Sequence, residues 1–474
     1  MRHKSVPPSL MTRMAARVAA RCLTVLVLGW GCATGALFAQ DNQDNNAAVP
    51  NAPAPLPQGG LQIRSVSAYA VYYSNFLPNG GFAAAGTTNL PSELGAGGSV
   101  EFDWTKFTER STFSLTYTPS YTGYVRNSSL NALNHALSLT TSRKIAPQWT
   151  FGFSAAGALT SLQESQFAPT ALGNVAGALA TFNDLAAALL TGNFANNPQL
   201  GALLNSSPLA QSPISNLLYG QRMFTSSAHA SLSYSYSPRL SVTFSGGAAR
   251  SQHVDDQALG VGNVPLIPNT TSGNATVNVS YSLSPLTQIG GTVSSSRTSS
   301  LIYDGYTTTS LATLGRTLAG RWVVQVHGGV GVTNAVREAN AIVSAKPGPA
   351  IGGSLTYKTL SHTFLGSYDR AVSDTYGLGA STSSAANAAW QWRHRGSSWW
   401  LASSFGWQQL QGNVLADLSG WNSTVGLNRA IGAHFVLLTQ YSHLTYSRGL
   451  QAAAHTSQDS VRASIEWTHH PALQ

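Results

Sequence analysis

The sequence is poor in charged residues. Only 9% of its 474 residues are charged, whereas soluble globular domains carry about 25%. Hydrophobic residues make up an ordinary 43%, so a larger apolar core has not taken the place of the missing charges. Small and polar residues fill the gap, among them 45 glycines. This composition argues against an ordinary soluble enzyme.

Long hydrophobic runs are also missing after the N-terminus. A transmembrane helix needs about 20 consecutive, predominantly apolar residues. The chain therefore does not have the sequence of a helical membrane protein, although its low charge content sets it apart from soluble proteins as well.

Cysteine occurs only twice, at Cys22 and Cys32. Both lie in a basic N-terminal segment whose apolar stretch, Leu23 to Ala33, is followed by small residues up to Ala39. This pattern predicts a secretory signal peptide over residues 1–39. A membrane anchor and lipidation at Cys32 are the alternatives. The mature chain then has no cysteine, which excludes disulfides, thiolate metal sites and a cysteine nucleophile.

The signal peptide also accounts for much of the positive charge. Five of the 26 Lys and Arg lie in it, which leaves 21 against 17 Asp and Glu, a net charge of +4. We therefore expect no nucleic-acid partner. Residues 40–60 are rich in Asn, Asp, Pro and Ala, and this composition predicts a disordered periplasmic tether.

From residue 61 to residue 474 the dominant pattern is alternation with a period of two. Val100, Phe102 and Trp104, for example, alternate with Glu101 and Asp103. Such alternation is typical of strands with one apolar and one polar face. The polar face lacks the Lys and Glu that keep a soluble sheet in solution, so we expect the apolar face to meet lipid. The pattern recurs at 149–155, 240–245, 274–281 and 461–467.

Short and long connections alternate between these segments. The eight short ones are predicted at 108–111, 144–148, 237–239, 284–286, 319–321, 360–362, 395–398 and 430–433. The nine longer ones are predicted at 75–97, 126–130, 161–223, 252–271, 299–307, 337–346, 373–378, 411–416 and 448–455. Eight turns and nine loops join 18 antiparallel strands, with 16 as the alternative. The asymmetry is typical of an up-and-down transmembrane β-barrel with periplasmic turns and external loops.

Taken together, the signal peptide, the alternation, the turn asymmetry and a final strand that ends in an aromatic residue resemble the porin-like outer-membrane β-barrels. That final strand is Ser460–Trp467, although seven residues follow it, where the family usually ends. The resemblance implies a bacterial outer-membrane location, contact with outer-membrane lipid, and insertion by the barrel-assembly machinery. It also raises a homotrimer as an assembly, which no residue pattern marks.

The third external connection, 161–223, departs from the alternation. Its 170–190 segment has apolar residues at helical spacing, interrupted by polar residues. The resemblance to porins suggests that this partly helical insertion folds into the lumen as a constriction. A plug and an external cap are the alternatives. Apart from Arg222 at its end, only Glu164 and Asp184 are charged, so such a constriction favours neutral solutes.

Arginines on or near the polar phase of their strands are candidates for lining the pore, because rings of Arg favour anions. The alternatives are that they pair with acids such as Asp369 and Glu466, or that they lie near the periplasmic headgroups. The candidate pore-lining residues are Arg297, Arg316, Arg393, Arg429, Arg462, Glu101 and Asp103.

Tryptophans gather beside the predicted periplasmic turns. An indole is apolar on its ring and polar at its N–H, which suits the headgroup level of a bilayer. We therefore predict a membrane-interface girdle of Trp104, Trp149, Trp322, Trp390, Trp392, Trp399 and Trp467.

The sequence favours a channel for the diffusion of small hydrophilic solutes. The alternative is a plugged barrel that acts as a surface scaffold or takes part in glycan export. An enzyme is not expected, because the one His/Asp cluster in a predicted external loop, His253 with Asp255 and Asp256, has no nucleophile context. No cofactor and no metal site are predicted.

Overall fold

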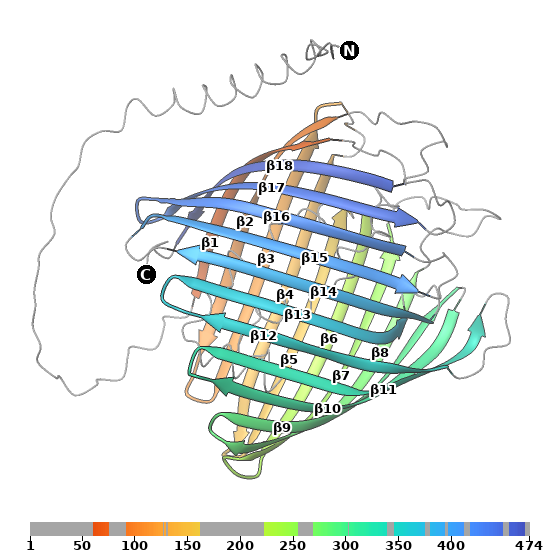
Figure 1. The fold of residues 1–474 in the computed structure, drawn as a ribbon. Coiled ribbons are helices and arrows are strands. Elements are labelled where there is room, and N and C mark those ends of the chain that lie inside the picture. Colours follow the sequence, from red (N-terminus) through yellow and green to blue (C-terminus); the bar gives the residue numbers. More distant parts are fainter. Residues whose placement is uncertain are drawn as a thin grey trace, which may run out of the picture. The chain divides into compact units, whose positions relative to one another are not determined.

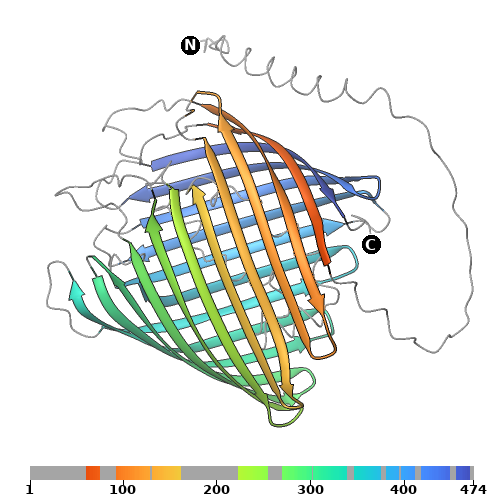
Figure 2. The ribbon, with the colours of Figure 1, turned by 180° about the vertical axis from the view of Figure 1, so that it is seen from behind.

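Eighteen antiparallel β-strands form one closed barrel in the computed structural model of the chain (Figures 1 and 2). The structure describes residues 60–74, 92–126, 128, 131–161, 222–254, 269–301, 303–338, 346–374, 380–393, 397–411, 418–448 and 455–469. The first nine strands are β1 (Gly60–Tyr73), β2 (Glu93–Phe107), β3 (Ser111–Tyr124), β4 (Ala132–Ala146), β5 (Trp149–Ser161), β6 (Arg222–Ser235), β7 (Leu240–His253), β8 (Thr270–Ser284) and β9 (Thr287–Ser300). The other nine are β10 (Tyr303–Leu318), β11 (Trp322–Glu338), β12 (Lys346–Lys358), β13 (His362–Asp374), β14 (Ala380–Arg393), β15 (Trp399–Gln411), β16 (Leu418–Ile431), β17 (Phe435–Arg448) and β18 (His455–Thr468).

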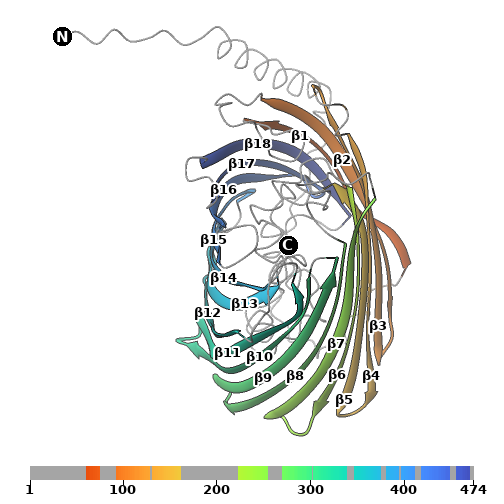
Figure 3. The ribbon, with the colours of Figure 1, turned by 90° about the vertical axis from the view of Figure 1, so that its right-hand side faces the viewer.

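Each strand pairs with its neighbours in the sequence, and β1 pairs with β18 to close the barrel. Closure leaves no free sheet edge, which is what allows a sheet to cross hydrocarbon. Figure 3 shows the strands arranged as a ring. The prediction of an 18-stranded all-β barrel is confirmed, and the 16-stranded alternative is wrong. Within the described ranges, no helix combines the length and the apolar character needed to cross a bilayer.

All eight predicted short connections are found between strands, at one end of the barrel, here called the short-turn end. The β10–β11 turn contains Ala319 and Gly320 with φ of 49° and 67°. Positive φ at both positions matches the twist of the flanking strands in a tight hairpin. The other end is here called the long-loop end. One prediction there is wrong, because only two residues separate Ser300 from Tyr303 where a loop over 299–307 was expected.

Exposure alternates along each strand and identifies the two faces of the wall. In β10, Tyr306, Leu314 and Leu318 are exposed, whereas Tyr303 and Thr313 are not. Side chains crowd together on the concave face of a curved sheet and spread apart on the convex face, so the exposed set points outward. The insertion 161–223, the tether and the signal peptide lie outside the described residues, apart from strand ends.

Candidate functional site: the inner wall of the barrel

The outer face of the barrel is apolar over most of its height. Exposed Val, Leu, Ile and Phe side chains follow one another around the wall, a surface far larger than the apolar patches of soluble monomers. An even number of antiparallel strands with such an exterior defines a transmembrane barrel of the bacterial outer-membrane type. Examples are Ile63, Val66, Phe244, Val277, Val293, Leu314, Val326, Leu355, Phe364, Phe405, Val425, Leu427 and Val461.

All seven tryptophans predicted for the girdle lie on the outward phase of their strands, near the short-turn end. Three of them pack against aromatic side chains of the next strand: Trp149 on Tyr234 at 4.6 Å between ring centroids, Trp322 on Tyr357 at 4.2 Å, and Trp104 on Phe113 at 5.2 Å. These pairs place aromatic rings of adjacent strands side by side on the outer wall, and their role as a membrane-interface girdle stays a prediction. Trp400, which the sequence analysis did not assign, points inward.

The inner face is hydroxyl-rich and largely uncharged. Side chains on adjacent strands hydrogen-bond to one another across it, as Ser67 does with Ser99 at 2.8 Å between their Oγ atoms. These pairs use part of the hydrogen-bonding capacity of the hydroxyl groups within the wall. The remaining donors and acceptors are left for water or solute. Further pairs are Ser233 with Thr243 at 3.0 Å, Ser241 with Ser280 at 2.6 Å, Thr307 with Thr333 at 3.2 Å and Thr424 with Ser442 at 3.1 Å.

Charged groups on the inner face gather where β18, β1 and β2 meet. Arg64 lies 3.2 Å from Glu101 (Nη1 to Oε1). Asp103 accepts hydrogen bonds from the hydroxyls of Ser114 and Thr116, at 3.2 Å each. The Arg462 guanidinium lies 3.8 Å from the ring centroid of Tyr69. Glu466 shares the inward phase of Arg462 on β18.

The opposite wall also carries inward polar and charged groups. The His327 Nε2 lies 3.3 Å from Asp369 Oδ1. This contact spans β12, and it fits because Gly352 has no side chain beneath the imidazole. Arg393 lies 5.9 Å from the ring centroid of Trp400. Of the predicted pore-lining residues, Glu101, Asp103, Arg393 and Arg462 therefore point inward, and each has a partner in the wall.

Three predicted pore-lining arginines point outward, which corrects the sequence assignment. Arg297 forms two hydrogen bonds with the Asp304 carboxylate, at 2.9 and 3.1 Å, and Arg316 is exposed on the phase of Leu314. Arg429 lies 4.8 Å from the ring centroid of Trp399. All three lie towards strand ends, where a long cationic side chain reaches the headgroup level while its stem covers apolar surface. Their polarity was therefore a poor guide to the side they face.

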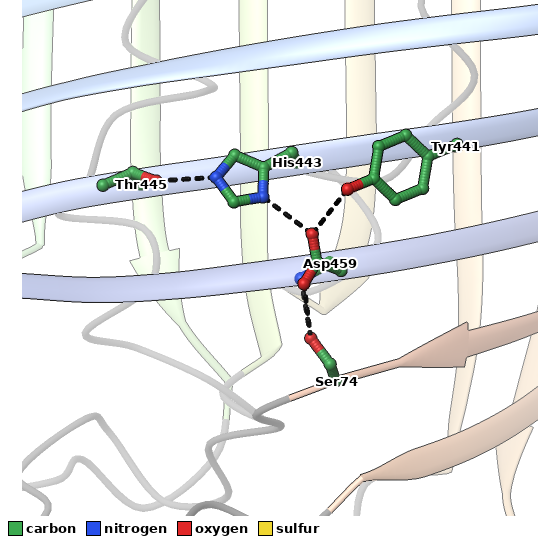
Figure 4. Close-up of polar contacts among 5 residues, drawn as sticks. All are labelled: Ser74, Tyr441, His443, Thr445 and Asp459. Atoms are coloured by element: carbon green, nitrogen blue, oxygen red, sulfur yellow. Dashed lines mark hydrogen bonds and ion pairs between the residues drawn. The ribbon is translucent and has the colours of Figure 1, made fainter. Parts of the chain in front are cut away.

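A polar network lies on the outer face at the long-loop end, where β17, β18 and β1 meet (Figure 4). Asp459 Oδ1 lies 2.7 Å from both His443 Nδ1 and the Tyr441 hydroxyl, and Ser74 donates to its other oxygen at 3.3 Å. The His443 Nε2 lies 2.9 Å from the Thr445 hydroxyl. The network ties three strands together across the closing seam.

The predicted His253 cluster falls outside the described side chains. Among those described, no group of three or more His, Cys, Asp or Glu is placed to hold a metal.

No protein-family model matches the chain, and no curated protein matches it. Among solved structures, OpdK of Pseudomonas aeruginosa, crystallised with vanillate, is 12% identical with a TM-score of 0.43, covering 85% of this chain and 97% of its own. OccAB4 of Acinetobacter baumannii is 10% identical with a TM-score of 0.42, covering 87% and 99%. A BenF-like porin from Pseudomonas fluorescens is 10% identical with a TM-score of 0.43, covering 86% and 98%. Similarity of this degree says nothing about the solute of this chain.

Proposed function

We propose that the protein is a channel for the passive diffusion of small hydrophilic solutes across the outer membrane. The observation that carries the proposal is the contrast between an apolar outer face and a hydroxyl-rich inner face around one closed wall. Barrels of 16 to 18 strands are wide enough to leave an aqueous channel. Serine, threonine and asparagine on the inner face offer both donors and acceptors to water and to neutral polar solutes.

The proposed channel has weak ion selectivity. The inward charges concentrate near the β18–β1–β2 wall, where Arg64 is paired with Glu101 and Asp103 is held by two hydroxyls. Paired opposite charges give a smaller net field along the lumen than a ring of one sign does. Sugars and other neutral solutes are therefore the substrate class that the wall supports best.

Planar-bilayer recording and liposome swelling test the proposal. The purified protein is expected to give discrete open steps in KCl and to let arabinose and glucose enter liposomes, with little reversal potential across a salt gradient. Complete absence of conductance and of sugar entry would overturn the channel. A channel that appears only after deletion of residues 162–221 would instead indicate that this insertion is a plug. Its role as a constriction stays a prediction, as do the homotrimer and insertion by the barrel-assembly machinery.

Inward and outward arginines provide a matched pair of variants. Arg462→Gln removes a cation from the lumen wall, so the reversal potential in a KCl gradient is expected to shift by a few millivolts towards cation selectivity. Arg316→Gln removes a cation from the outer face and is expected to leave the reversal potential unchanged. Equal shifts in both variants would contradict the assignment of the two faces.

A further inference from the structure

The wall of the barrel splits between β12 and β13 at the long-loop end. Pairing of these two strands ends at Ile351 with Arg370. On either side the ladders continue, β11 with β12 as far as Lys346 and β13 with β14 as far as Asp374. At about 3.3 Å per residue, the unpaired part is roughly 15 Å long.

Two prolines in β12 lie in the part of the strand that does not pair with β13. Pro347 and Pro349 pair with Val332 and Val330 of β11, and the β11 ladder continues past both. The N–H groups that the prolines lack are therefore the ones that would face β13. Proline within a sheet is confined to strand edges because it cannot donate to the ladder. Strand β12 thus behaves as an edge strand over this part of its length.

Beyond the split, β13 passes inside β12. Val372 lies on the outward phase of β13, yet it packs against the inward-facing Gly348 and Gly331 of β12 and β11. Strand β13 also contacts β11 and β10, which are not its neighbours in the ladder. Figure 3 shows β13 within the ring of the other strands. The two parts of the wall therefore overlap, with Val372 between them where glycine leaves room.

The outer face beside this split carries apolar side chains and one arginine. Ile351 and Tyr368 are exposed on its two sides, at 44% and 41% of their surface. Arg370 lies between them on the outward phase of β13. Its Nε is buried and has no hydrogen-bond partner among the described residues. A buried guanidinium donor without a partner costs free energy unless an acceptor reaches it.

We propose that the slit between β12 and β13 is a lateral binding site and passage between the lumen and the outer leaflet for amphiphilic anions. The anionic head accepts a hydrogen bond from Arg370, and the alkyl chain lies along Ile351 and Tyr368 in the membrane. Val372 closes the inner side over Gly348 and yields when a solute passes. The inference rests on the proposed function, because the passage leads into an open lumen.

An engineered disulfide across the overlap tests the passage. The Cβ of Val372 lies 3.9 Å from the position of a Cβ on Gly348, within the about 3.5–4.5 Å that a disulfide requires. The double variant Gly348→Cys/Val372→Cys therefore locks the slit, in a chain whose only cysteines lie in the predicted signal peptide. The matched control is Ser67→Cys/Ser99→Cys, which joins two paired strands on the inner face.

The measurement is block of single-channel current by decane-1-sulfonate, a permanently charged amphiphile that partitions into the bilayer. The wild type and the control disulfide are expected to be blocked. The locked variant is expected to need about tenfold more sulfonate, equivalent to the loss of about one hydrogen bond to a charged group, and reductant should restore the block. Methanesulfonate, which has no alkyl chain, should block none of the variants.

Arg370→Gln tests the head-group contact and is expected to weaken the block by about tenfold. Arg250→Gln, which removes an exposed arginine on β7, should leave the block unchanged. Equal block in the locked and reduced states, or failure of the cysteines at 348 and 372 to cross-link, would overturn the passage while conductance persists. If the wild-type protein gave no conductance at all, the proposed channel function itself would be contradicted.

Discussion

The barrel has two special seams, β18 with β1 and β12 with β13, and they are built differently. The first closes the barrel through nine consecutive pairs that run up to Tyr73. Above them Ser74 and Asp459 exchange backbone and side-chain hydrogen bonds at 2.8 Å. The second has eight pairs and then separates, with β13 on the inside. Hydrogen-bond donors at the strand ends keep one seam closed, whereas missing donors leave the other open.

The largest change in the free energy of unfolding is expected when a charge is placed on the lipid-facing side of the β18–β1 seam. Ala463→Arg places a guanidinium on the outward phase of β18, where it must leave the hydrocarbon or disturb it. The free energy of unfolding is expected to fall by about 2–4 kcal/mol, measured by denaturant unfolding in lipid vesicles. The adjacent Ser464→Arg points into the lumen and is the control. A comparable loss in Ser464→Arg would contradict the assignment of inner and outer faces.

A smaller loss in the free energy of unfolding is expected when a side chain is added at Gly348, where β13 packs inside β12. A Cβ at Gly348 collides with Val372, so Gly348→Ala is expected to lower the free energy of unfolding by about 1–3 kcal/mol through overpacking. Adding Val372→Ala should recover most of the loss. Gly328→Ala, in β11, has open space around its Cβ position and should be nearly neutral. If Val372→Ala gives no rescue, the packing of β13 inside β12 is contradicted.

The smallest loss in the free energy of unfolding is expected when one carboxylate is replaced in the polar contacts near each seam. Asp459→Asn weakens bonds to Tyr441, His443 and Ser74 and should cost about 1 kcal/mol, because the carboxylate is partly exposed. Asp369→Asn at the other wall weakens one contact, to His327, and should cost less. The same vesicle unfolding assay measures both. A larger loss for Asp369→Asn would mean that Asp459 does not hold the closing seam.

Much of the fold follows from the sequence because a membrane wall imposes a strict period of two. Val100, Phe102 and Trp104 face outward and Glu101 and Asp103 inward, as the alternation predicts. The short turns are predictable because only a few residues separate two alternating segments. The β9–β10 loop was overestimated, since the polar residues from Ser299 to Thr307 belong to strand ends that extend beyond the apolar band.

The arginines show where residue type misleads. Arg316 follows Leu314 at a spacing of two, and Arg429 follows Leu427 likewise, so alternation alone places both outward. Their charge suggested the lumen instead. In the structure both arginines face outward, as the alternation indicates. This is possible because both lie near strand ends, where they reach polar headgroups. The outward direction of the seven tryptophans was easier to predict, since residue type and alternation both place them on the apolar face.

The sequence by itself determined the strand number, the order of turns and the side that most residues face, because all three are local consequences of alternation and chain length. Only the tertiary structure decided how the strands meet at each seam. The overlap of Val372 with Gly348 and Gly331 joins three strands, and the Asp459 network joins residues 385 positions apart. Such contacts depend on which strand ends lie side by side after closure, and no period along one strand carries that information.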